Sequence, residues 1–145
     1  MHLLRRHKYI ILSLGIYWPV LFVLTHIPVP KIANESHMSD KTMHLLAYMT
    51  LTFFVWLALC PYQKVKWNRP LVWIILIVIA AYGGFDEWLQ GRVGRQMEFM
   101  DFVGDIKGAL IGLGLLTFLS FWPALLVVSS IFIFAITNLS VLLDL

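Results

Sequence analysis

Charged residues are scarce in this chain: Asp, Glu, Lys and Arg together make up 13% of the 145 residues, while 60% are hydrophobic. A small water-soluble domain cannot hide so large an apolar share inside one core. The mean hydropathy of +0.82 points the same way. The composition therefore excludes an ordinary soluble domain and predicts an integral membrane protein.

Several features that would indicate a particular chemistry are also missing. Cys60 is the only cysteine, so no internal disulfide can form. The chain has no nucleophile elbow, no phosphate-binding glycine loop and no internal repeat, and the missing repeat argues against a transporter. The net charge of +3 comes from basic residues in short connections between apolar runs, so we expect no nucleic acid partner. No motif indicates a cofactor.

Long uncharged stretches alternate with short polar connections and predict the membrane-spanning helices. The first stretch follows the basic flank MHLLRRHK, and its length, its Trp18-Pro19 pair and the lack of a cleavage site favour a spanning helix over a signal peptide. The last stretch is too long for one crossing, and Trp122-Pro123 is the natural division. The predicted helices cover residues 9–27, 42–60, 70–90, 101–122 and 123–143.

We therefore expect an all-α fold in which residues 1–145 form a single domain. This domain is expected to be a polytopic transmembrane bundle of about five spanning helices, with a four-helix core and a further C-terminal helix. Membrane lipids are its expected surroundings.

Basic residues at the helix ends predict the orientation in the membrane. They concentrate before the first predicted helix and between the second and the third, which places both of these ends in the cytoplasm. These residues are Arg5, Arg6, Lys8, Lys64, Lys66 and Arg69. The amino terminus is then cytoplasmic, and the connections after the first and third helices are extracytoplasmic.

Acidic residues are concentrated around the third and fourth predicted helices, since five of the eight lie between residues 82 and 112. The uncharged run 70–85 makes about 24 Å of helix, which is short of the roughly 30 Å hydrocarbon layer. The helix must therefore continue through Asp86 and Glu87 towards Gln90. Asp86 and Gln90 are one turn apart and share a face.

The fourth predicted helix has the same shortfall. Its uncharged part, 108–122, must extend back through Asp105 towards Asp101 in order to cross the bilayer. Gly108 and Gly112 continue the face of these two acids at helical spacing, and small residues allow another helix to approach closely. We therefore expect the acids to face protein rather than lipid.

A polar stripe on the second predicted helix completes the pattern. Asp40, His44 and Tyr48 follow one another at spacings of four, so they share one face of that helix. This stripe opens on the extracytoplasmic side, where both acidic clusters also end. We therefore expect three separate segments to converge into one polar site on that side.

These polar residues resemble three sequence blocks of the VanZ-like family, small bacterial multi-pass membrane proteins named for a member associated with resistance to the glycopeptide antibiotic teicoplanin. The blocks are Asp40-Lys41-x-x-His44-x-x-x-Tyr48, Asp86-Glu87-x-x-Gln90, and Arg95 followed by DFVGDIKGALIG, and they span residues 40–112. One position departs from the family pattern, because the family usually has Asn where this chain has Asp105. The resemblance implies a bacterial cytoplasmic membrane protein of the cell envelope, with an expected contribution to glycopeptide resistance.

The candidate site consists of eight polar side chains from these blocks: Asp40, His44, Asp86, Glu87, Gln90, Arg95, Asp101 and Asp105. Ionisable groups within membrane segments are costly and by default mark function. The first hypothesis is that the site binds or acts on a polar group carried by a lipid at the outer leaflet, such as the head group of a cell-wall precursor, or a glycopeptide. Arg95 and Lys41 would hold phosphate or carboxylate, and His44 with Asp86 or Glu87 would move a proton.

Three alternatives use the same residues. A divalent cation would bind oxygen ligands from Asp86, Glu87, Asp101 and Asp105, with His44 as a further ligand. A non-enzymatic membrane subunit would bind a partner protein or a cationic ligand through its acidic face. In a purely structural interpretation, the charges form interhelical ion pairs and caps, with Asp40 capping the second helix. The sequence leaves open whether the protein is an enzyme and in what oligomeric state it exists.

Overall fold

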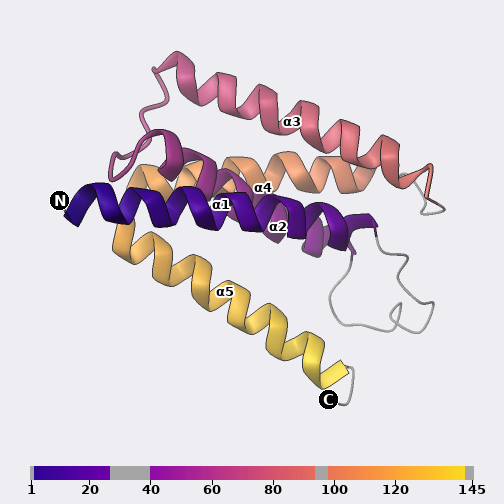
Figure 1. Cartoon of the computed structure of the whole chain (residues 1–145). Coiled ribbons are helices and arrows are strands. Elements are labelled where there is room, and N and C mark those ends of the chain that lie inside the picture. The colour runs from indigo at the N-terminus through magenta and orange to yellow at the C-terminus, as the bar shows by residue number, and fades with distance from the viewer. Residues whose placement is uncertain (1, 27–39, 94–97, 143–145) are drawn as a thin grey trace.

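The computed structural model describes residues 2–26, 40–93 and 98–142 of the chain. Helices account for most of these residues, and no strand occurs among them (Figure 1). The helices are α1 (His2–His26), α2 (Asp40–Leu59), α3 (Pro70–Gln90), α4 (Phe99–Phe118) and α5 (Phe121–Leu142). Within these residues, the predicted all-α fold with five helices is confirmed.

The first four helices pack together, and α2 is the central element because it contacts α1, α3 and α4. The last turns of α1 and α3 lie at the same end as the first turns of α2 and α4, on the right-hand side of Figure 1. We call this end, formed by residues 22–26, 40–44, 86–90 and 98–105, the polar end. At the opposite end, the His7 ring donates to Ala58 O at 2.8 Å and joins the start of α1 to the end of α2.

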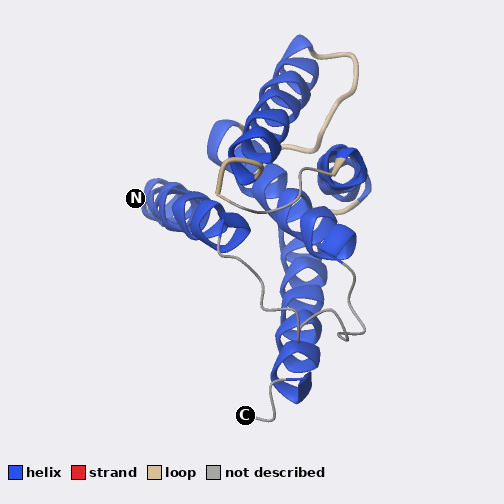
Figure 2. Ribbon diagram, turned by 90° about the vertical axis from the view of Figure 1, so that its right-hand side faces the viewer, coloured by secondary structure: helices blue, strands red, loops and turns tan. Residues whose placement is uncertain are grey.

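The last helix, α5, packs against the other four helices through its first half. Ala124 and Val128 are buried, whereas Leu126, Ile133 and Phe134 are each about two-thirds exposed. Figure 1 and Figure 2 both show the end of α5 standing apart from the other helices. The fold is therefore a packed group of four helices with a C-terminal helix attached through its start.

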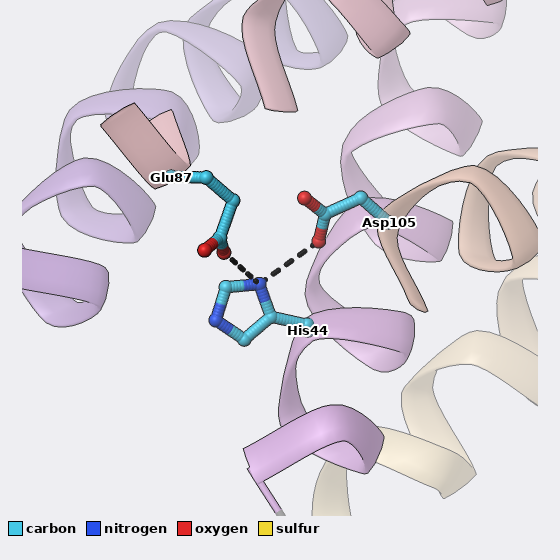
Figure 3. Close-up of side chains that lie close together, drawn as sticks. All are labelled: His44, Glu87 and Asp105. Carbon is cyan, nitrogen blue, oxygen red and sulfur yellow. Dashed lines mark hydrogen bonds and ion pairs between the residues drawn. The ribbon is translucent and has the colours of Figure 1, made fainter. Parts of the chain in front are cut away.

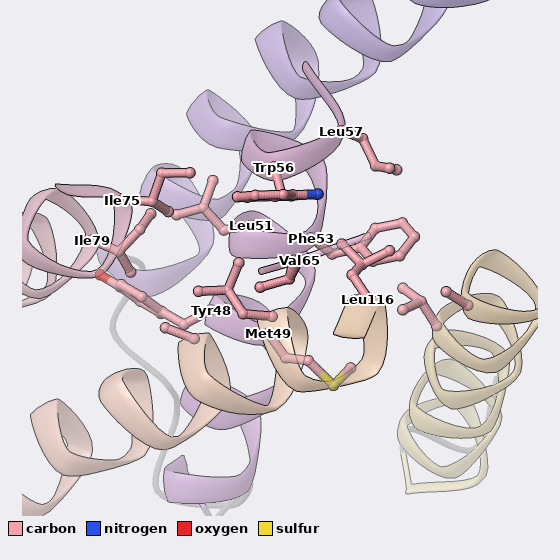
Figure 4. Close-up of a cluster of buried hydrophobic side chains, with 14 of the residues drawn as sticks. Tyr48, Met49, Leu51, Phe53, Trp56, Leu57, Val65, Ile75, Ile79 and Leu116 are labelled. Atoms are coloured by element: carbon pink, nitrogen blue, oxygen red, sulfur yellow. The ribbon is translucent and has the colours of Figure 1, made fainter. Parts of the chain in front are cut away.

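The hydrophobic core is built mainly on α2, whose Tyr48, Leu51, Phe53 and Trp56 side chains are fully buried (Figure 4). The Trp56 indole N–H donates to the backbone carbonyl of Gln63 at 2.8 Å, so its polar atom is satisfied within the core. Apolar side chains of α3 and α4 pack around this row; the buried ones include Val72, Ile75, Ile79, Ala109, Leu113 and Leu116. The core thus holds α3 and α4 against α2 and positions their polar ends.

Glycines on α4 bring its backbone directly against α2. A Cβ atom built on Gly112 would lie 2.6 Å from the backbone carbonyl oxygen of Met49, and one built on Gly108 would overlap the carbonyl oxygen of Leu45. Gly104 continues this row towards the polar end. The prediction that Gly108 and Gly112 allow close approach of another helix is confirmed, and the partner is α2.

The boundary between α4 and α5 differs from the predicted one. Leu119 has an extended backbone, with φ −93° and ψ 146°, and its N–H still bonds to Leu115 O at 2.8 Å. The helix therefore ends at Phe118, and the predicted division at Trp122-Pro123 is wrong. Pro123 lies in the first turn of α5, where its missing N–H has no intrahelical partner to lose.

The first helix begins at His2, seven residues before the predicted start, so the basic flank is itself helical. α1 also continues through Pro19 to His26.

Two helices within the described residues are long and apolar enough to cross a membrane, namely Lys41–Leu59 and Pro70–Gln90. Shorter apolar stretches cover His7–Val23 and Phe121–Ile131. The first half of α4 carries three charged side chains, which lower its hydropathy. Length and composition thus support two spans, whereas the sequence interpretation expected about five.

Candidate functional site

Side chains from all four packed helices meet at the polar end and form a buried polar cluster. None of them is more than 8% exposed, and the four carboxylate side chains are at most 3% exposed. The polar cluster consists of Thr25, His44, Asp86, Glu87, Gln90, Asp101 and Asp105. Burial of this many ionisable groups is expensive unless they are paired, so their contacts decide what the cluster can do.

His44 lies at the centre of the polar cluster, between carboxylates from two other helices (Figure 3). Its Nδ1–H donates to Asp105 Oδ1 at 2.9 Å. Glu87 Oε1 lies 3.7 Å from the same ring nitrogen. Two buried carboxylates therefore share one imidazole, which carries at most one positive charge.

Asp86 is held by hydrogen bonds from two helices. Gln90, one turn later on α3, donates its side-chain N–H to Asp86 Oδ2 at 2.9 Å. From α1, the Thr25 hydroxyl donates to Asp86 Oδ1 at 3.2 Å, and His26 Nδ1 lies 3.7 Å from that oxygen. Both oxygens of this carboxylate thus have polar partners.

The contribution of α1 to the polar cluster was missed by the sequence interpretation. The available signal was the polar pair Thr25-His26 at the end of an otherwise apolar run. A helix end with two adjacent polar residues commonly reaches water, so this pair did not by itself predict a buried contact. Only the packing of α1 beside α3 brings Thr25 to Asp86.

Exposed charges border the polar cluster. Lys41 and Glu98 form an ion pair with 3.8 Å between Nζ and Oε2, and their side chains are 53% and 48% exposed. Such a surface ion pair contributes at most about 1 kcal/mol to the free energy of unfolding. The backbone N–H of Glu98 donates to Glu87 Oε2 at 3.3 Å, so the start of α4 also holds Glu87. Lys41 is therefore a cation at the border of the cluster and is accessible from outside.

Some buried oxygen atoms in or beside the cluster make no hydrogen bond with any described residue, among them Glu87 Oε1, Asp105 Oδ2 and the Tyr48 hydroxyl. The Tyr48 and His44 rings are nearly parallel, with 9° between their planes and 6.4 Å between their centroids. Buried acceptors without a donor are destabilising by about 1–3 kcal/mol each. The cluster is thus only partly satisfied by its own hydrogen bonds.

Gly83 on α3 makes room for the Asp105 carboxylate. A Cβ atom at Gly83 would lie 2.8 Å from Asp105 Oδ2 and 3.4 Å from Tyr48 Cε1. Gly83→Ala is expected to displace the carboxylate from His44 and lower the free energy of unfolding by about 1–3 kcal/mol. Chemical unfolding in detergent micelles, followed by tryptophan fluorescence, measures this change.

The neighbouring Gly84 provides a matched control. A Cβ atom there would have only Phe102 within 4 Å, at an ordinary 3.7 Å. Gly84→Ala should leave stability unchanged or raise it by up to about 1 kcal/mol, because alanine favours helix. Equal losses in the two variants would contradict the close contact at Gly83.

The structure brings together six of the eight candidate residues. These are His44, Asp86, Glu87, Gln90, Asp101 and Asp105, all of them buried. Asp40 begins α2, but its side chain and the whole of Arg95 lie outside the described residues. The capping role considered for Asp40 and the anion-binding role considered for Arg95 stay predictions.

Comparisons of the chain with family models, with curated proteins and with solved structures find no match. The VanZ-like resemblance therefore stays a sequence-based expectation that concerns the three blocks. Chemically, the cluster offers carboxylate oxygens and an imidazole in a place where water is largely excluded. Such a set can hold a cation, move a proton or orient a polar ligand at the border.

Proposed function

We propose that this chain is a polytopic protein of the bacterial cytoplasmic membrane, whose polar cluster is a site for the head group of a lipid-linked or other cell-wall component on the extracytoplasmic side. One observation carries the proposal: four helices each place buried polar or ionisable side chains at the same end of an otherwise apolar bundle. Such groups are costly in a membrane segment and usually serve function.

Exposed apolar surface supports the membrane part of the proposal. On the outer face of α3, Trp73, Ile74, Ile77 and Val78 are each at least half exposed. Soluble monomers rarely expose a contiguous apolar surface of this kind, whereas lipid tails cover it without cost. The outer faces of α1 and α5 also carry large exposed hydrophobic side chains.

The distribution of basic residues supports the orientation. Lys64, Lys66 and Arg69 follow α2 at the end of the bundle opposite the polar cluster, and Lys8 lies in the early part of α1 at that same end. Positive residues favour the cytoplasmic side. The polar cluster would then face outwards, where Lys41 is the exposed cation that a phosphate or carboxylate meets first.

The proposal is tested by gene deletion and complementation in the source bacterium. Deletion should lower tolerance of teicoplanin or another wall-active compound, as measured by the minimal inhibitory concentration. The wild-type chain should restore this tolerance, whereas Asp86→Asn and Asp101→Asn should lose most of it, because each removes a buried charge of the cluster. Glu98→Gln, which alters an exposed carboxylate at the same end, should behave as wild type.

Correct insertion of each variant is verified in the same cells. In a Cys60→Ala background, a membrane-impermeant maleimide should label Arg92→Cys from outside and leave Lys66→Cys unlabelled. The functional proposal fails if both Asp variants insert and restore full tolerance. Labelling of Lys66→Cys from outside would overturn the orientation.

The non-enzymatic subunit is the second candidate, and one observation favours it. Among the described side chains of α5, Ala124 and Val128 are buried, whereas Leu126, Ile133 and Phe134 are each about two-thirds exposed and are left to lipid or to another helix. A stoichiometric partner that co-purifies with the wild-type chain and is lost with Asp86→Asn would favour this candidate over direct action on a head group.

A further inference from the structure

The three residues at the centre of the polar cluster have the geometry of a metal site. His44, Glu87 and Asp105 each offer a ligand atom, and these atoms lie within 4.8 Å of one another. The Nδ1 atom of His44 is 2.9 Å from Asp105 Oδ1 and 3.7 Å from Glu87 Oε1. Around one ion with bonds of about 2.1 Å, tetrahedral ligand atoms are about 3.4 Å apart. Only small side-chain adjustments therefore separate the observed positions from coordination.

The charge balance of these residues also points to a cation. Glu87 and Asp105 are both buried and share the single imidazole of His44. Within the described part of the chain, no Lys or Arg forms an ion pair with either carboxylate, and Lys41 pairs instead with the exposed Glu98. A buried negative charge without a counter-charge is strongly unfavourable.

Unsatisfied oxygen atoms provide an independent indication of a ligand. Glu87 Oε1 and Asp105 Oδ2 are buried and accept no hydrogen bond from the described residues. The Tyr48 hydroxyl, on a side chain with no exposed surface, is likewise without a hydrogen bond among them. The Tyr48 ring and Asp105 Oδ2 both approach the Cβ position of Gly83, so they lie beside each other against α3. A cation would give the two carboxylate oxygens the partner that the described residues do not provide.

The ligand set indicates which cation fits. One imidazole nitrogen and two carboxylate oxygens suit Zn²⁺ or Mn²⁺, whereas Mg²⁺ and Ca²⁺ prefer oxygen ligands alone. Copper(I) prefers sulfur, and Cys60 lies beyond the far end of α2. Three protein ligands leave a position open for water or for an anionic group of a bound molecule.

We infer that His44, Glu87 and Asp105 form a binding site for one divalent transition-metal ion, Zn²⁺ or Mn²⁺. Metal binding releases to water the proton that His44 Nδ1 donates to Asp105, and the second positive charge of the ion compensates the second carboxylate. This inference rests on the polar site proposed above and assigns it a ligand. An anionic head group that reaches the polar end would then meet the open position of the metal as well as Lys41.

Metal binding is measured on the purified full-length chain in detergent, after removal of the affinity tag and treatment with a chelator. Titration with ZnCl₂ and MnCl₂ should show about one tightly bound equivalent and a rise in unfolding temperature, because a ligand that binds only the folded state stabilises it. MgCl₂ and CaCl₂ should bind at least about tenfold more weakly. These measurements on the wild-type chain do not depend on how any variant folds.

Two isosteric substitutions form a matched pair. Glu87→Gln should weaken Zn²⁺ or Mn²⁺ binding by more than about 100-fold, since even residues that only support a ligand contribute 10- to 100-fold. Glu98→Gln makes the same change on an exposed carboxylate at the same end and should leave binding unchanged. His44→Gln should abolish the tight equivalent.

The result that overturns the inference is a wild-type chain without a tight equivalent of either metal, or a Glu87→Gln variant that binds as tightly as wild type. Its failure is distinguishable from failure of the proposed function. A metal-free protein whose Asp86→Asn variant loses tolerance refutes only the metal site. A metal-binding protein whose Asp86→Asn and Asp101→Asn variants restore full tolerance refutes only the proposed function.

Discussion

Gly108→Ala is expected to push α4 away from α2 and to lower the free energy of unfolding by at least about 3 kcal/mol. The new methyl group would occupy the position of the Leu45 carbonyl oxygen and would also lie 2.9 Å from the backbone nitrogen of Met49. Backbone atoms within a helix cannot rotate aside as a flexible side chain does, so the two helices must separate. Chemical unfolding in micelles, followed by far-ultraviolet circular dichroism, measures the loss.

Gly114 on the same helix is the matched control, because a Cβ atom there has nothing within 4 Å. Gly114→Ala should leave stability unchanged or increase it by up to about 1 kcal/mol through the higher helix propensity of alanine. If the two alanine variants were equally stable, the backbone contact between α2 and α4 would be refuted.

Removal of the His44 imidazole is expected to have the second large effect. His44→Leu leaves Glu87 and Asp105 buried without the group that both contact, and breaking a buried ion pair on one side costs about 3–5 kcal/mol. The free energy of unfolding should fall by that amount in the presence of a chelator. Lys41→Met removes one partner of the exposed pair and should cost at most about 1 kcal/mol.

A double variant separates lost pairing from lost packing. Asp105→Asn removes one of the two buried carboxylates that His44→Leu leaves without a partner. The double variant should therefore recover part of the stability that His44→Leu alone loses. The double-mutant cycle gives the interaction energy directly. If the losses in the free energy of unfolding of the two single variants simply add, then the contact of 2.9 Å between His44 and Asp105 contributes nothing to stability.

Local sequence patterns were sufficient to predict the number and order of the described helices, but not all of their boundaries. The uncharged run that follows Pro70 is too short for a bilayer, which required its helix to continue through Asp86, and α3 indeed ends at Gln90. The spacing of four between Gly108 and Gly112 likewise placed them on one face of α4. The start of α5 was less predictable, because proline is tolerated in the first turn of a helix as well as between helices.

The tertiary structure decided which helix faces contact one another. Spacing along one helix places residues on a common face, but it does not state which neighbouring helix that face will contact or at what height. For this reason the sequence indicated that Asp105 faces protein, while only the packing of α2, α3 and α4 joined it to His44 and Glu87.

The sequence alone determined an all-helical chain with its acids and one histidine drawn to helix ends, because hydrophobic length and 3.6-residue periodicity are properties of single segments. Only the folded chain determined that Thr25 of α1 bonds to Asp86, that Gly83 makes room for Asp105, and that two carboxylates share one imidazole. These contacts join helices far apart in sequence, and their geometry depends on how the whole bundle packs.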